Sequence, residues 1–93
     1  MTKTQKQRDK QIRSVLTIAC ETIKETVFGF HYLTHSVDLN NETDTLKVQC
    51  FFNDDIALES ATPQLDELKD IILNQLASIK LNIKPAHILF FAN

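Results

Sequence analysis

The chain is poor in the residues that interrupt regular structure and in those that build catalytic loops. Its 93 residues include one glycine, two prolines and no tryptophan. A single glycine excludes glycine-rich phosphate loops, the dinucleotide-binding fingerprint and the nucleophile elbow, because each of these motifs needs more than one. The same scarcity leaves little room for long irregular loops. We therefore expect regular elements joined by short connections, and no enzyme of these classes.

Cysteines and long apolar runs are also scarce. Cys20 and Cys50 are too few for a disulfide framework. The sequence has no apolar run of about 18 residues and no secretory leader pattern, so we expect a cytoplasmic protein with reduced thiols and no membrane partner. An apolar share of 43% is enough for one core at this length. Residues 1–93 are thus expected to form a single domain.

The net charge of −2 is unevenly distributed along the chain. Residues 14–93 carry five basic and eleven acidic side chains, which would repel phosphate. Residues 1–13 carry a single acidic side chain, Asp9, among the basic residues Lys3, Lys6, Arg8, Lys10 and Arg13. Contact with nucleic acid is therefore expected through this segment, whose residues 1–10 form either a basic arm or an extension of a helix.

Apolar residues at helical spacing predict a first helix over residues 9–27, with a possible earlier start. These residues are Ile12, Val15, Leu16, Ala19, Cys20, Ile23 and Val27. Gly29 stands where the glycine that ends a helix belongs. If the helix begins earlier, Lys3, Lys6, Lys10 and Arg13 fall within roughly 80° of one another, away from the apolar stripe.

From residue 30 the apolar period changes to two, which indicates strands. Residues 30–39 place His31, Leu33 and His35 on one face, with Phe30 and Tyr32 on the other. Residues 46–52 alternate in the same way, with Leu46, Val48, Cys50 and Phe52 facing one side and Lys47, Gln49 and Phe51 facing the other. The polar stretch NNETD, residues 40–44, predicts a turn between them. The two strands are expected to form an antiparallel hairpin.

Residues 53–93 are expected to form a loop, a helix and a strand. Residues 53–61 are expected to form a loop with at most one helical turn, followed by a helix over 63–80 with Thr62 as N-cap and Pro63 at N1. AHILFF, residues 86–91, predicts a strand covered on both faces. A right-handed crossover makes the last two strands parallel. The expected fold is α+β, a two-layer αββαβ sandwich with a three-stranded mixed sheet and two helices on one face.

The histidines, the cysteines and one pair of aspartates are the residues that could bind a metal or take part in catalysis, and none of them is in a suitable pattern. His31 and His35 lie four residues apart, and on a strand this separates them by roughly 13 Å, too far to bind one metal ion together. Cys20 and Cys50 fall on apolar faces and are expected in the core. The pair Asp54–Asp55 follows a strand and is expected to cap or turn the chain. We therefore expect no catalytic residue, no metal and no cofactor, and a protein that acts by binding.

Two surfaces are candidates for binding. The basic residues Lys3, Lys6, Arg8, Lys10 and Arg13 suit the phosphates of RNA or DNA, or an acidic protein, unless they are simply a solvated terminus. Phe30, Tyr32 and Phe51 are expected on the open face of the sheet. Aromatic side chains there suit stacking on bases. They equally suit burial against a protein partner or a second copy of the chain.

Four stretches, spread along most of the chain, resemble a family of short proteobacterial proteins labelled Fis-type transcriptional regulators. They are QIRSVLTIACETI, GFHYLTHSVDL, TLKVQCFFND and LNIKPAHILFF. The family provides no functional residue to carry over. Strands in three of the five expected elements do not fit the all-helical helix-turn-helix that the label implies.

THSVDLN, LKVQCFFND and KLNIKPAHILFF are similar in order and spacing to the ribosome-binding factor A family. That resemblance implies a KH-like fold and a module associated with RNA or the ribosome. In that family the connection between the second helix region and the last strand grips nucleic acid through a small-residue kink. Here the connection, QLASIKLNIKP, has no glycine and only Ala77 and Ser78 as small residues, which argues against RNA binding at that place.

Overall fold

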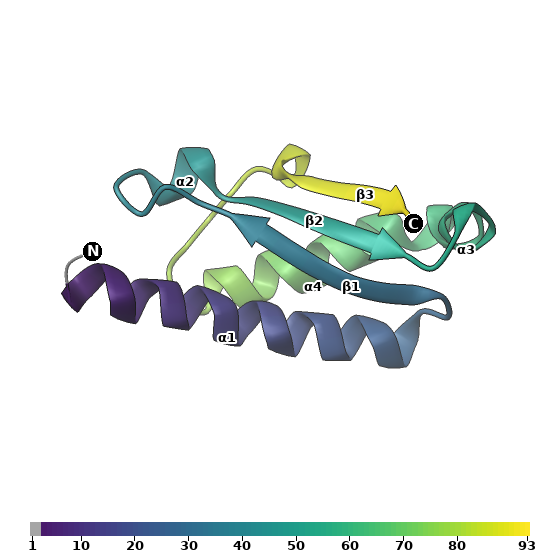
Figure 1. Cartoon of the computed structure of the whole chain (residues 1–93), viewed down its shortest axis with the longest axis horizontal. Coiled ribbons are helices and arrows are strands. Elements are labelled where there is room, and N and C mark those ends of the chain that lie inside the picture. Colours follow the sequence, from purple (N-terminus) through teal and green to yellow (C-terminus); the bar gives the residue numbers. More distant parts are fainter. Residues whose placement is uncertain (1–2) are drawn as a thin grey trace.

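The computed structural model describes residues 3–93, and side chains from residue 4 onward (Figure 1). It is an α+β fold with a three-stranded mixed sheet, as expected. The main elements are α1 (Lys3–Thr26), β1 (Phe30–Ser36), α2 (Glu42–Thr45), β2 (Lys47–Phe52), α3 (Asp55–Ala61), α4 (Leu65–Ala77) and β3 (Ile88–Ala92). Two short 3-10 turns, η1 (Thr62–Gln64) and η2 (Pro85–His87), precede α4 and β3.

The sheet has the order β1-β2-β3. β1 and β2 are antiparallel, and β2 and β3 are parallel, which confirms the predicted hairpin and crossover. Figure 1 shows α1 and α4 side by side on one face of the sheet, while the opposite face has no helix over it. The molecule is elongated, with extents of 42 × 21 × 21 Å, and α1 follows its long axis.

The core lies between this sheet and the two long helices. α1 contributes the predicted apolar stripe, with Cys20 at its margin. All four predicted inward residues of the next segment are buried, three of them in β2 and Leu46 directly before it. The connector after α4 also belongs to the core, because Leu81 and Ile83 are buried. The fully buried large side chains include Ile12, Ile23, Leu46, Val48, Phe52, Leu68, Ile72, Leu76 and Leu81.

The first residues of β1 do not follow the expected alternation of inward and outward side chains. Phe30 pairs with Phe52, but Tyr32 pairs with Phe51, so His31 is an extra residue in β1. This bulge turns Phe30 toward the core, where it is 6% exposed and meets the Phe52 ring edge-on at 5.5 Å. The expectation that Phe30 lies on the open face was therefore wrong. Tyr32 and Phe51 do lie on that face.

Four further expectations after β2 were wrong. Residues 55–61 form a helix, α3, and Asp54 caps it by accepting a hydrogen bond from the Ala57 amide at 2.8 Å. Thr62 does not cap α4, because its hydroxyl donates to the Leu58 carbonyl at 3.2 Å. The α4 helix begins at residue 65 and ends at 77 rather than spanning 63–80. β3 is covered on one face only, since Leu89 and Phe91 are exposed.

Among residues 3–93, Gly29 and Lys80 have positive φ, and each lies shortly after the end of a helix. Gly29 follows α1 with φ of +89°, as the sequence predicted. Lys80 follows α4 with φ of +62°, a conformation that is uncommon for a side chain with a Cβ. The Lys80 amide donates to the Ala77 carbonyl and the Leu81 amide donates to the Leu76 carbonyl, which together form a Schellman motif. The chain thus turns sharply from α4 into the buried connector.

Candidate nucleic-acid interface

Arg8 ties the first turns of α1 to two other segments. Its Nε donates to the Glu42 carboxylate at 2.6 Å, and its Nη1 donates to the Ile79 carbonyl at 2.6 Å and to Gln11 at 3.2 Å. The Arg8 side chain is 22% exposed. Of the predicted basic residues, Arg8 is therefore turned toward the fold. It brings the start of α1 next to α2 and next to Ile79, and so next to Lys80.

The other predicted basic residues face away from the core. Lys6, Lys10 and Arg13 are exposed on α1. Arg13 pairs with Asp9 at 3.0 Å along the helix, whereas Lys6 and Lys10 make no ion pair with any described residue. Lys3 begins α1, and its side chain lies outside the described part. Residues 3–10 are thus a helical extension, with Lys6 and Lys10 pointing to solvent.

Lysines from later in the chain lie at the same end of the molecule. Figure 1 shows β2 beginning and α4 ending near the start of α1. The connector before β3 is attached there as well, because His87 Nδ1 donates to the Leu46 carbonyl at 3.1 Å. We call this region the basic end and define it by Lys6, Lys10, Arg13, Lys47, Lys80 and Lys84. These six residues come from α1, the start of β2 and the connector after α4.

An open groove of about 530 Å³ lies at the basic end, between α1 and the end of α4. Its lining consists of Gln7, Lys10, Gln11, Ser14, Val15 and Ile79. Amide, hydroxyl and ammonium groups of this kind contact phosphate and sugar in nucleic-acid complexes. The lining contains no carboxylate, so nothing directly in the groove repels a phosphate.

Acidic side chains are more numerous at the opposite end, around α3 and the start of α4, whereas the basic end carries Asp9, Asp38, Glu42 and Asp44 among its basic residues. Those exposed at the opposite end are Glu25, Asp54, Asp55, Glu59, Asp66 and Glu67. Because α1 runs along the molecule, its first turns belong to the basic end and its last turn belongs to this acidic end. A polyanion is attracted to one end and repelled by the other.

The open face of the sheet carries a row of aromatic rings, one from each strand. Tyr32 and Phe51 stack with centroids 4.8 Å apart and planes inclined by 15°. Phe51 and Phe91 stack at 5.4 Å and 25°. Phe91 had not been predicted, although its place in an apolar strand at the sheet edge was a usable signal. We call Tyr32, Phe51 and Phe91 the aromatic row.

The histidines and cysteines have local partners. Asn93 Nδ2 donates a hydrogen bond to His31 Nδ1 at 2.8 Å. The Nδ1 atom is therefore assigned as the unprotonated ring nitrogen of His31. Burial lowers the pKa of His35; the nearby Asp9 opposes this and Arg13 adds to it. Burial raises the pKa of the Cys50 thiol to about 12, and Cys20 adds to the effect. His35 is therefore favoured as neutral imidazole and Cys50 as an unreactive thiol.

Within residues 3–93, no three histidine, cysteine, aspartate or glutamate side chains come together as a metal site would require. Across the same residues, no helix is both long enough and apolar enough to cross a membrane. Comparison with protein-family models, with curated proteins and with solved structures gave no match.

Proposed function

We propose that this protein is a non-enzymatic binding module that contacts nucleic acid through its basic end. The observation that carries the proposal is a groove without carboxylates that Lys10 lines and that Lys80 adjoins at Ile79, at the end of the molecule where Lys6 is also exposed. Within the described part, the five lysines of the basic end have no ion-pair partner, namely Lys6, Lys10, Lys47, Lys80 and Lys84. Their charge is thus available to phosphates, and binding would release counterions.

RNA, in the setting of the ribosome, is the nucleic acid that we favour. The chain resembles the ribosome-binding factor A family in the order of its elements, and the KH-like fold of that family binds the small ribosomal subunit. The helix pair α3–α4 between β2 and β3 supports this reading of the order.

Arg8 has a different role in the proposal, because its donors are occupied by Glu42 and Ile79. It positions the first turns of α1.

Fluorescence anisotropy with a labelled single-stranded RNA of about 20 nucleotides tests the proposal. We expect affinity to fall steeply with salt, with log K decreasing by about 0.7 for each neutralised phosphate per decade of salt. Replacing two contacts in the double variant Lys6→Glu/Lys10→Glu is expected to reduce the slope by about 1.4 or more. The absence of salt-sensitive binding at low ionic strength would contradict the proposal.

The matched control is Lys24→Glu/Lys69→Glu, which changes the net charge equally at the acidic end. Its RNA affinity is expected to stay within about twofold of the wild type near physiological salt, where charges are screened within about 8 Å. Equal losses in the two variants would mean that net charge, not the basic end, governs binding. Thermal unfolding of both variants shows whether they remain folded.

A second candidate function is self-association through the aromatic row. Tyr32 and Phe91 are exposed, and Leu89 lies exposed beside them on β3. Phe51 stacks on Tyr32 at one side and on Phe91 at the other, so both faces of its ring are already occupied. A base could not stack on Phe51, and the aromatic row is therefore better suited to burial against protein. Three short strands cover roughly 300 Å², well below the roughly 800 Å² per partner of a stable complex. A dimer of this kind would be weak.

Sedimentation equilibrium up to high protein concentration tests self-association. We expect a monomer–dimer equilibrium in the upper micromolar range that Phe91→Lys abolishes, because a charge would then be buried in the interface. Thr22→Lys serves as control, since it adds the same charge at an exposed position on α1, away from the open face of the sheet. A strictly monomeric wild type would reject this candidate.

A further inference from the structure

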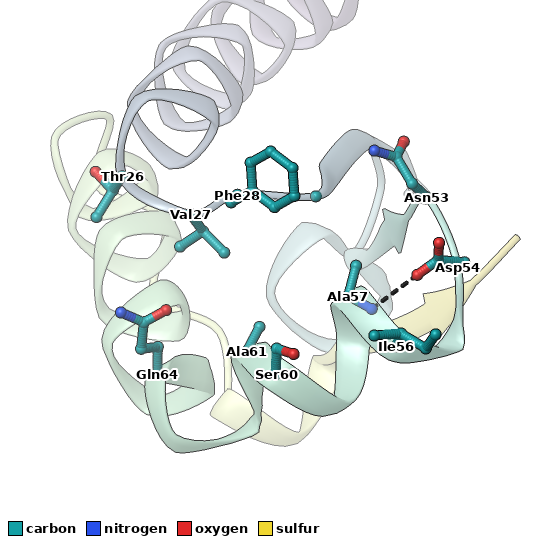
Figure 2. Close-up of a pocket in the computed structure, with 11 residues that line it drawn as sticks. Thr26, Val27, Phe28, Asn53, Asp54, Ile56, Ala57, Ser60, Ala61 and Gln64 are labelled. Carbon is teal, nitrogen blue, oxygen red and sulfur yellow. Dashed lines mark hydrogen bonds between the residues drawn. The ribbon is translucent and has the colours of Figure 1, made fainter.

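A pocket of about 580 Å³ opens at the acidic end, between the last turn of α1, the Gly29 turn and α3 (Figure 2). Figure 2 shows Val27, Ala57 and Ala61 directed into it. The volume falls within the range of about 300–1,000 Å³ typical of ligand pockets. The pocket is separate from the basic end and from the aromatic row.

Two large apolar side chains that line this pocket lie in water. Phe28 is 98% exposed and Ile56 is 75% exposed, more than any other large apolar residue described. Neither of them contributes to the core. Covering exposed apolar surface beside an apolar pocket removes it from water, which makes the binding of a partner there favourable. An apolar group between Phe28 and Ile56 would bury both side chains.

The one charged side chain in the pocket lining is acidic, and acidic side chains outnumber the exposed Lys24 around it. The lining includes Asp54 and contains no lysine or arginine. Glu25, Asp55 and Glu59 are exposed on the residues next to the lining. Asp54 also holds the first turn of α3, because it accepts the hydrogen bond from Ala57. Such a surface attracts cations and repels nucleic acid and anionic lipid.

We propose that this pocket binds a basic peptide segment of a partner protein. One large apolar side chain of the segment enters between Phe28 and Ile56, and lysines or arginines on either side face Glu25, Asp55 and Glu59. A second copy of this chain does not fit the role. In its own basic segment, residues 1–13, Ile12 is buried in the core, and Met1 precedes the lysines in the sequence rather than lying between them.

The probe is a fluorescein-labelled peptide of about twelve residues, with a central Phe–Leu pair and lysines on both sides. We expect saturable binding by anisotropy and amide chemical-shift changes at Gly29, Asn53 and Ser60. The variant Phe28→Ser/Ile56→Ser is expected to weaken binding at least about tenfold. It should stay folded, because both side chains lie in water. Ile18→Ser, an exposed apolar position in the middle of α1, is the matched control and should bind like the wild type.

Three results would overturn the proposal. The first is no binding at about millimolar peptide. The second is equal binding by a peptide whose Phe–Leu pair is replaced by serines, or whose lysines are replaced by glutamates. The third is a set of shifts confined to the aromatic row. The test does not depend on nucleic-acid binding, since Lys6→Glu/Lys10→Glu should leave the peptide affinity within about twofold.

Discussion

Gly29 is the residue on which the junction of α1, β1 and α3 depends. Its φ of +89° disfavours any side chain, and a Cβ there would lie 2.5 Å from the Ala57 Cβ. Gly29→Ala combines a left-handed conformation costing about 1–2 kcal/mol with this overlap. We expect a loss of about 2 kcal/mol or more in the free energy of unfolding, measured by urea denaturation.

The Gly29–Ala57 contact can be separated from the backbone effect by a double-mutant cycle. Ala57→Gly alone removes the neighbouring Cβ and costs about 1 kcal/mol as a glycine within α3. In the double variant the overlap is gone while the unfavourable φ remains. Its loss should therefore be smaller than the sum of the two single losses. Strict additivity would show that the close approach costs nothing.

Cys50 gives the stability a dependence on alkaline pH. Burial raises the pKa of its thiol from 9.0 to about 12. Between these values the unfolded chain loses the thiol proton while the folded chain keeps it, so stability falls as pH rises, by up to about 1.4 kcal/mol per pH unit. Urea denaturation from pH 8 to 10.5 should show this fall in the wild type. Cys50→Ala is less stable at pH 8 but should lose less between the two pH values; equal losses would contradict the assignment.

At the scale of elements, Arg8 decides whether the first turns of α1 stay attached. Arg8→Met keeps the apolar stem and removes the donors to Glu42 and Ile79. Since hydrogen bonds to charged groups contribute about 1.5–3 kcal/mol, we expect a loss of about 2 kcal/mol. Amide hydrogen exchange should accelerate in residues 6–12 more than in residues 18–23.

Arg13 provides the matched control on the same helix. Its pair with Asp9 is exposed, and exposed pairs typically contribute less than about 1 kcal/mol. Arg13→Met should therefore leave both stability and exchange nearly unchanged. If both variants behaved alike, the contacts of Arg8 would have no special weight, and the start of α1 would be held by apolar packing alone.

Periodicity predicted the long elements well, because α1, β2 and α4 each bury one regular stripe. It failed where one residue changes the register or a short capped turn decides the structure. The bulge at His31 has no signature in the alternation, so Phe30 was assigned to the wrong face. The α3 helix has only seven residues, so residues 53–61 were assigned to a loop although Asp54 was expected to cap or turn the chain.

The two charged ends exist only at the scale of the whole molecule. The sequence revealed the basic segment 1–13 but gave no reason to join it with Lys80, which the contact of Arg8 with the Ile79 carbonyl brings next to the start of α1. One signal was available for Arg8. It lies four residues before Ile12 and thus on the apolar stripe, which separates it from Lys6 and Lys10.

Lys10 and Lys24 allow the separation of the ends to be tested along one helix. They lie on similar sides of α1 and about 21 Å apart, at 1.5 Å per residue. At physiological salt the screening length is about 8 Å, so Lys10→Glu should weaken RNA binding while Lys24→Glu should not. At about 10 mM salt the screening length is near 30 Å, and Lys24→Glu should then weaken binding as well. If Lys24→Glu weakened binding equally at both salt concentrations, RNA would be contacting the far half of α1, and the basic end would not be the interface.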